Sequence, residues 1–531
     1  MKRVSFLAAI LLFTLHGIAQ SNIDVLHYKF NVELNDNNDT IYGLAEIKVR
    51  FPETSKSLTL DLKKNNTSGK GMILENVSGP GVRGNNNDDE TFTIFFTQPF
   101  KENDTATFII KYKGIPSDGL IISKNKYDHR TFFADNWPNR GHNWLPCHED
   151  PADKATVEFI VTAPQHYQVV SNGIQVEETN LASDKKLTHW KEDVPISTKV
   201  MVIGVADFAV NLSGTINNCV PVYSYVYPED RDKGFYDYAQ AAEILPWFIQ
   251  NVGPYAYKKL ANVQSKTIFG GLENANTIFY SEGSVSGTRR SEGLLTHEIA
   301  HQWFGNYATE KSFAHLWLSE GFATYMTILY MDNKYGEDTA IAMLKEDREQ
   351  AIRFGKRNPL PVVNHTKDYM QLLNANSYQK GGWVLHMLRR QLGDEIFWKS
   401  IQTYYAEYGG KTADSDDLRK VFEKISGKDL QQFFKQWLFT PANLSLDISW
   451  KYNADKNEVA VTVNQIQQPG DFQFPLEILI QESAAGMPKR TIKEVKKNIE
   501  TFIFSVKKKP ARIEIDPMVS LLFEGNISEA K

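Results

Sequence analysis

Two histidines four residues apart, His297 and His301, stand on either side of a short segment that begins with Glu298. If this segment is helical, one turn places both imidazole rings on the same face. Two imidazoles and one carboxylate form a set of three zinc ligands that leaves a fourth position open for water or substrate. Glu298 lies about 100° around the helix from His297. It is therefore poorly placed as the third ligand but well placed to accept a proton from a water molecule that zinc activates.

The third ligand is expected from a later segment, and Glu320 is the candidate. Eighteen residues separate it from His301, enough for a turn and the start of a second helix. The competing interpretation is a solvated helix face that carries two histidines by chance. Trp303 and Phe304 favour a buried helix instead, in which two unsatisfied histidines would be costly. The sequence therefore predicts zinc ligation by His297, His301 and Glu320.

Four motifs resemble those of a known enzyme family. They are GGLEN at residues 270–274, HEIAHQWFGN at 297–306, WLSEGFATY at 317–325 and YQKG at 378–381. In this order they resemble the motifs of the zinc aminopeptidases of peptidase family M1, a member of the gluzincin group. Leu272 stands where the family usually has Met in its exopeptidase motif. The similarity extends over most of the mature chain.

The resemblance implies roles for residues outside the ligand set. Tyr378 would donate a hydrogen bond to the oxyanion formed during peptide hydrolysis, although the sequence alone favours a buried tyrosine that anchors a helix. Glu273 would bind the α-ammonium group of a substrate, so that only the first peptide bond reaches the zinc. Gly270 and Gly271 would let the substrate backbone approach closely, and Asn274 completes this substrate-binding motif. Without the resemblance, the same motif would indicate only a turn between two strands.

Relatives in this family often add a second anchor for the amine, a Gln or Glu from the N-terminal β domain. The corresponding stretch here is FADNWP at residues 133–138. Asp135 could take this role with a shorter reach, or it could equally be a turn residue. His142, His148 and Glu149 match no ligand spacing, and the last two are expected in a turn next to a proline.

Hydrophobic periodicity divides the chain into a signal peptide and three domains. Residues 21–222 alternate apolar and polar positions, as in 45–51, which predicts an all-β domain. Residues 223–441 are mainly helical, and 442–531 return to short alternating segments that predict a small β-sandwich. The predicted fold class is multidomain α+β, and the family resemblance implies a thermolysin-like catalytic domain in the middle.

Within the middle domain, helical patterns cover residues 237–248, 338–354, 377–392 and 415–425, with one β-like piece at 267–280. Many relatives in the family carry a large C-terminal helical domain. We expect a three-domain form without it, because no residues follow the predicted sandwich.

Residues 1–20 have the pattern of a secretory signal peptide, with a basic start, an apolar stretch and the small residues Gly17 and Ala19 at the expected cleavage site. The apolar stretch is too short for a comfortable membrane span, and no other run of eighteen apolar residues occurs. We therefore expect export to the periplasm or the cell exterior, without stable membrane insertion.

The composition is that of an ordinary globular protein, with 42% hydrophobic and 23% charged residues. A net charge of −5 offers no basic surface for nucleic acid. Cys147 and Cys219 are the only cysteines, and we expect two free, buried thiols rather than a disulfide.

The sequence thus predicts a zinc aminopeptidase with one Zn²⁺ per chain that acts on peptides with free N-termini. One alternative is a zinc endopeptidase, which would not need Glu273. Another is an inactive, zinc-bound binding module, against which the intact Glu298 argues. The sequence indicates neither the preferred N-terminal residue nor the oligomeric state.

Overall fold

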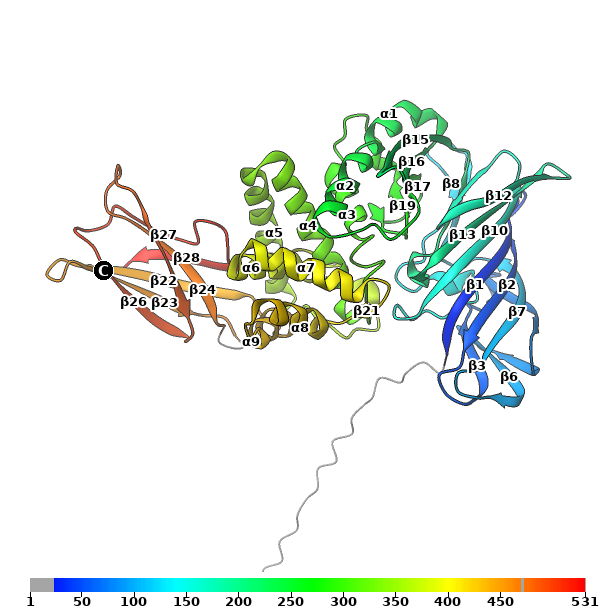
Figure 1. The fold of residues 1–531 in the computed structure, drawn as a ribbon, viewed down its shortest axis with the longest axis horizontal. Helices are drawn as coiled ribbons and strands as arrows, with labels where there is room; N and C mark the ends of the chain where they lie inside the picture. The colour runs from blue at the N-terminus through cyan, green and yellow to red at the C-terminus, as the bar shows by residue number, and fades with distance from the viewer. Residues whose placement is uncertain (1–22, 469–471, 531) are drawn as a thin grey trace, which may run out of the picture.

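The computed structural model describes residues 23–468 and 472–530. Three parts follow one another along an elongated molecule, with β-strands at both ends and helices in the middle (Figure 1). The predicted α+β fold class, with an N-terminal all-β domain, a mainly helical middle domain and a C-terminal β domain, is confirmed. The predicted signal peptide, residues 1–20, lies outside the described residues.

The N-terminal domain contains a seven-stranded sheet in the order β12-β13-β10-β1-β2-β7-β4, a four-stranded sheet β11-β14-β9-β8 and a three-stranded sheet β3-β6-β5. In β10 every second residue is buried, which is the pattern of a strand with one face on the core. The strands are β1 Asp24–Glu33, β2 Ile41–Arg50, β3 Ser55–Asp61, β4 Gly71–Ser78, β5 Val82–Asn87, β6 Thr91–Phe100, β7 Thr105–Ile115, β8 Leu120–Lys124, β9 Arg130–Ala134, β10 Lys154–Pro164, β11 Gln168–Ser171, β12 Ile174–Leu181, β13 Lys185–Ser197 and β14 Ile203–Ala206.

A five-stranded sheet, in the order β15-β16-β17-β19-β18, connects the first two domains. Its strands are β15 Ala209–Ile216, β16 Val220–Val226, β17 Leu260–Ser265, β18 Gly271–Leu272 and β19 Thr277–Ser281. The predicted boundary between residues 222 and 223 falls inside β16. Val263 and Phe279 pack in the core of the N-terminal domain, whereas Ile278 and Tyr280 pack in the core of the helical domain. The sheet therefore lies between two hydrophobic cores, with β18 at its edge.

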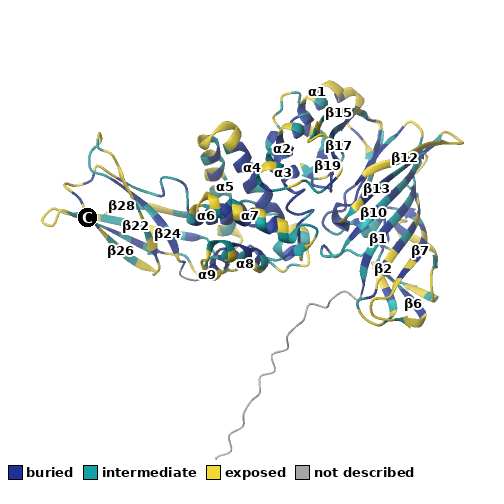
Figure 2. Ribbon diagram, in the orientation of Figure 1, coloured by how far each residue is buried: buried dark blue, intermediate teal, exposed yellow. Residues whose placement is uncertain are grey.

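The helices of the middle domain surround α4, most of whose residues are buried (Figure 2). This helix packs against α3, α5 and α6 and ends at Gly336, whose φ of +90° favours glycine. The helices are α1 Arg231–Tyr238, α2 Ala241–Asn251, α3 Glu292–Ala300, α4 Trp317–Tyr335, α5 Glu337–Arg357, α6 Gly381–Leu392, α7 Asp394–Tyr408, α8 Ser415–Ser426 and α9 Gln431–Phe434, with π-helical turns at Asn376–Lys380 and Lys435–Phe439.

The C-terminal domain has two sheets, β26-β23-β22-β28 and β25-β24-β27. It is joined to the middle domain by an ion pair between Arg348 and Asp516, with 3.0 Å between the charged atoms. The strands are β22 Leu444–Asn453, β23 Glu458–Gln465, β24 Phe474–Gln481, β25 Lys489–Val495, β26 Ile499–Ser505, β27 Arg512–Ile515 and β28 Phe523–Glu529.

Both cysteines are free thiols, as predicted, but only Cys147 is buried. Cys219 is exposed, because it lies in the turn that joins β15 to β16, so the prediction that it is buried is wrong. Among residues 23–468 and 472–530, no helix is both long and apolar enough to span a bilayer.

Candidate metal centre and active-site cavity

The two histidines of the first motif lie where α3 ends. His297 belongs to the last turn of the helix and His301 is its C-terminal cap, still with helical backbone angles. The ring centroids are 4.8 Å apart, and the two Nε2 atoms are 3.1 Å apart. The four-residue spacing therefore aims both rings at one point, as expected from the sequence.

Glu320 completes this group from the first turn of α4. Its Oε2 atom lies 3.2 Å from His297 Nε2 and 3.3 Å from His301 Nε2. Burial alone would raise the pKa of Glu320, but the neighbouring His301 and the close contacts of both imidazole rings with its carboxylate hold this pKa well below its usual range. An ionised carboxylate and two imidazole nitrogens thus converge closely enough to share one metal ion.

The contacts of His301 Nδ1 indicate which of the two ring nitrogens carries the proton. Nδ1 lies 3.1 Å from the carbonyl oxygen of Phe304 and 3.0 Å from the hydroxyl oxygen of Ser319. A carbonyl oxygen can only accept, so Nδ1 carries the proton and Nε2 presents its lone pair to the metal position. Gly305 makes room for this contact, because a Cβ atom there would lie 2.2 Å from Ser319 Oγ. Ser319 adjoins Glu320 in the chain, but no local sequence pattern indicates its contact with His301.

Glu298 faces the same cavity and is 5% exposed. Burial raises the pKa of its carboxyl well above the usual range, and the nearby Glu273 and Glu320 add to this effect. The carboxyl packs against the backbone of β18, where a Cβ atom at Gly271 would lie 2.2 Å from Glu298 Oε1. Glycine is therefore required at this position if the carboxyl is to stay where it is.

Tyr378 lies in the π-helical turn before α6, and its ring stacks on His297 with 5.9 Å between centroids. Burial and the charge of Glu320 raise the pKa of its hydroxyl well above the usual range, so the group stays protonated and can donate a hydrogen bond. The turn is placed by a backbone crossing with α4, since a Cβ atom at Gly321 would lie 2.7 Å from the carbonyl carbon of Gly381.

Glu273 follows the edge strand β18 and is 5% exposed. Its Oε1 atom has no hydrogen-bond partner among the described residues, although it is buried. Gly270 and Gly271 line the cavity beside it. Both amide atoms of Asn274 are likewise buried without a partner in the described part of the chain. An unpaired buried carboxylate oxygen is costly, which suits a group that binds a cationic ligand.

Of the residues predicted to form the site, all except Asn274 and Asp135 line one cavity of about 420 Å³. The residues that line it are Trp137, Phe269, Gly270, Gly271, Leu272, Glu273, Gly293, Leu294, His297, Glu298, His301, Glu320, Leu373 and Tyr378. One part of the wall is apolar, and the ionisable groups gather at the metal position. This arrangement can hold a metal ion beside an apolar wall within one cavity.

Asp135 lies outside the residues that line this cavity and is completely buried. Its Oδ1 atom pairs with Arg140, while Oδ2 accepts hydrogen bonds from Thr267 Oγ1 at 3.0 Å and from the Ile268 N–H at 3.1 Å. The protein itself supplies these donors. The contacts therefore favour a role in holding the segment before Gly270, and they do not favour the second amine anchor.

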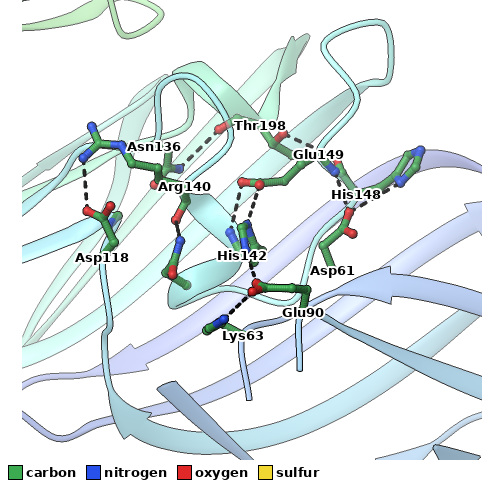
Figure 3. Close-up of polar contacts among 12 residues, drawn as sticks. Asp61, Lys63, Glu90, Asp118, Asn136, Arg140, His142, His148, Glu149 and Thr198 are labelled. Carbon is green, nitrogen blue, oxygen red and sulfur yellow. Dashed lines mark hydrogen bonds and ion pairs between the residues drawn. The ribbon is translucent and has the colours of Figure 1, made fainter. Parts of the chain in front are cut away.

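The polar residues around His142 form a separate cluster in the N-terminal domain (Figure 3). His142 Nδ1 lies 2.5 Å from Glu149 Oε2, and His142 Nε2 lies 3.1 Å from Glu90 Oε2. Burial lowers the pKa of His142, but its bonds to Glu149 and Glu90 more than offset this and raise it to about 9. This cluster faces a larger cavity of about 1300 Å³ between the N-terminal and middle domains.

Comparisons with known proteins agree with the motifs. The model of the peptidase M1 N-terminal domain matches residues 25–200, and that of the peptidase family M1 domain matches residues 236–437. Similar curated proteins include aminopeptidase 2 of Candida albicans, 25% identical over 86% of this chain and 51% of its own length. Another is the alanine/arginine aminopeptidase of Saccharomyces cerevisiae, 24% identical over 88% of this chain and 57% of its own length. A probable aminopeptidase 2 of Sulfurisphaera tokodaii is 28% identical over 64% of this chain and 47% of its own length. The chain thus spans about half the length of the curated relatives it matches.

We predict that a divalent cation stabilises the folded protein through Glu320. A cation that binds only the folded state at one hundred times its dissociation constant adds about 2.7 kcal/mol to the free energy of unfolding. Thermal melts after chelation and after cation addition measure this shift. Glu320→Gln should lose most of it, whereas Glu282→Gln, outside the cavity, should keep it. An equal shift in both variants would place the cation elsewhere.

Proposed function

Because this chain belongs to peptidase family M1, we propose that it is a zinc-dependent aminopeptidase that removes residues from the N-terminus of peptides. The observation that carries the proposal is the sharing of one cavity by the His297–His301–Glu320 group and Glu273. The first group suits peptide hydrolysis, and the second suits recognition of a free amine.

The donor set fits zinc. Tetrahedral zinc with bonds of about 2.0–2.1 Å requires ligand atoms about 3.3 Å apart, and the three separations here are 3.1, 3.2 and 3.3 Å. His297, His301 and Glu320 would hold the ion and leave a fourth position open. Bound zinc would lower the pKa of a water molecule towards about 7 and polarise the carbonyl of the scissile peptide.

Glu298 then acts as the general base and later as the general acid. Its raised pKa allows it to take a proton from the attacking water and pass that proton to the nitrogen of the departing amine. The carboxyl is confined between α3 and the backbone of Gly271, so it keeps one orientation through both transfers. Tyr378, protonated and stacked on His297, donates a hydrogen bond to the developing oxyanion.

Glu273 makes the enzyme an aminopeptidase. Its carboxylate binds the substrate's α-ammonium, and the fixed separation between this anchor and the metal ligands puts the first peptide bond at the reacting position. The alternative of a zinc endopeptidase leaves the unpaired Oε1 atom of Glu273 without a role. The alternative of an inactive binding module leaves the buried Glu298 without one.

We also propose that the protein is exported and acts on peptides in the periplasm or outside the cell. The support is the signal-peptide pattern of residues 1–20. Peptides with free N-termini are the proposed substrates, and the apolar side of the cavity accommodates the first side chain.

We predict that Gly271→Ala lowers turnover by ~10²-fold, because the added Cβ atom displaces the carboxyl of Glu298 and small displacements of reacting groups have effects of this size. Hydrolysis of aminoacyl-coumarin substrates measures this change. Gly283→Ala is the matched control, since Gly283 does not line the cavity and its Cβ atom would lie 4.0 Å from the nearest side-chain atom, Ser281 Oγ. Equal turnover in the two variants would contradict the packing argument.

Tyr378→Phe should lower turnover by ~10²–10³-fold with little change in the Michaelis constant, because the lost hydrogen bond forms mainly in the transition state. Steady-state kinetics with the same substrates measures both constants. Tyr404→Phe removes a hydroxyl from another buried tyrosine, one that packs on Phe322, and should leave turnover unchanged. If turnover survives Tyr378→Phe, the tyrosine serves packing alone.

Glu273→Ala tests the exopeptidase proposal directly. Wild type should cleave peptides with free N-termini and leave the same peptides intact when they are acetylated. The variant should lose most of this preference, since removal of one partner of a desolvated charge pair typically costs ~2–5 kcal/mol. Glu282→Ala is the control, because Glu282 pairs with Lys266 outside the cavity. Equal cleavage of both peptides by wild type would favour an endopeptidase.

A further inference from the structure

The turn that carries Glu273 is fastened to the segment just after the metal ligands. The main-chain carbonyl oxygen of Glu273 accepts two hydrogen bonds from side-chain amides. Gln302 Nε2 donates one at 3.1 Å, and Asn306 Nδ2 donates the other at 2.6 Å. Gln302 directly follows the ligand His301 in the chain, so the contact joins two parts of the site by a short path.

Gln302 also holds the other end of the same turn. Its Oε1 atom accepts the N–H of Asn276 at 2.7 Å, and its Nε2 atom reaches the Glu298 carbonyl at 3.3 Å. Gln302 is 1% exposed, so water does not compete for these bonds. One side-chain amide therefore closes the turn from Glu273 to Asn276 onto the end of α3.

The far end of the turn has further anchors. Asn276 has a positive φ of 51°, and its Oδ1 atom accepts from Lys259 Nζ at 2.6 Å and from the Gly173 N–H at 2.8 Å. Its Nδ2 atom donates to Glu192 Oε2 at 2.6 Å. Gly173 and Glu192 belong to the N-terminal domain. Asn276 is therefore fixed against that domain, which leaves Gln302, together with Asn306, to set the distance from the turn to the metal ligands.

The carboxylate and the main-chain carbonyl of Glu273 differ in their hydrogen bonding. Its Oε1 atom has no hydrogen-bond partner among the described residues, while its carbonyl oxygen has two. The position of the carboxylate relative to His297 and His301 thus depends on the backbone of the turn. A change in that backbone would move the amine anchor while the ligand atoms, held by α3 and α4, stayed in place.

We propose that Gln302 is a positioning residue that fixes the distance between the amine anchor Glu273 and the metal ligands. This inference rests on the proposed function, since it assigns to Gln302 an effect on the binding of a free α-ammonium. Gln302 does not line the cavity, so its proposed effect on substrate binding is through the position of Glu273.

A double-mutant cycle with Gln302→Met and Glu273→Ala tests this role in the full-length protein. Methionine keeps the length and volume of the side chain and removes its hydrogen bonds. The single variant Gln302→Met should raise the Michaelis constant of a free-amine peptide by about tenfold, with a smaller change in turnover and with unchanged metal content. Its preference for free over acetylated peptides should fall in parallel.

In the Glu273→Ala background, Gln302→Met should change the Michaelis constant by less than about twofold, because the group it positions is already gone. Gln264→Met is the matched control. Gln264 is a buried glutamine of β17, in the sheet that contains β18, and it bonds to Tyr227 and Asp230. Its loss should leave the preference for free amines intact.

The outcomes distinguish failure of the positioning role of Gln302 from failure of the proposed aminopeptidase function. If the tenfold effect persists in the Glu273→Ala background, Gln302 has a general structural role and the inference is overturned while the aminopeptidase proposal stands. If Gln302→Met loses metal or leaves the Michaelis constant unchanged, the inference is also overturned. If Glu273→Ala itself leaves the preference for free amines unchanged, the anchor and the proposed function fail together with it.

Discussion

The middle domain holds two imidazole nitrogens and a carboxylate oxygen within 3.3 Å of one another, at a place largely shielded from water. Two separate helices supply these atoms, so their separation must be held by contacts elsewhere. One contact is the bond between Ser319 and His301, for which Gly305 leaves space. Another is the crossing of Gly321 with Gly381, which places the turn of Tyr378 against α4. A small set of glycines thus permits the close approach of the helices that the ligand atoms require.

The cavity also brings three buried carboxyl groups close together. Glu273, Glu298 and Glu320 are all buried around about 420 Å³, and the charges of Glu273 and Glu320 disfavour the ionisation of Glu298. In the proposed function, two cations balance them: a metal ion at Glu320 and a substrate ammonium at Glu273. Burial raises the pKa of the Glu298 carboxyl, which is the group proposed for proton transfer. In the proposed function, the three carboxyl groups of this cavity thus differ in role: metal binding, ammonium binding and proton transfer.

The convergence of His297 and His301 could be predicted from the sequence because a four-residue spacing places two side chains on one helix face, whatever surrounds them. Other features depend on contacts distant in the chain. Residues 237–248, predicted as one helix, span the end of α1 and most of α2, with a break at residues 239–240. The hydrophobic pattern continues across this break, so the sequence does not indicate it. The helix predicted at 377–392 begins with a π-helical turn, which no apolar period distinguishes. The bonds of Asp135 and Gln302 involve partners 132 and 29 residues away, and no local pattern encodes them.

The sheet formed by β17, β19 and β18 has both faces in hydrophobic cores, and this has a consequence for how the protein folds. Val263 and Phe279 would be left exposed to water if the N-terminal domain were absent. The edge strand that carries the glycines of the active site is therefore completed only when residues far apart in the chain have come together. The shared sheet therefore couples the stability of the first two domains, and the edge of the cavity is complete only when both domains are folded.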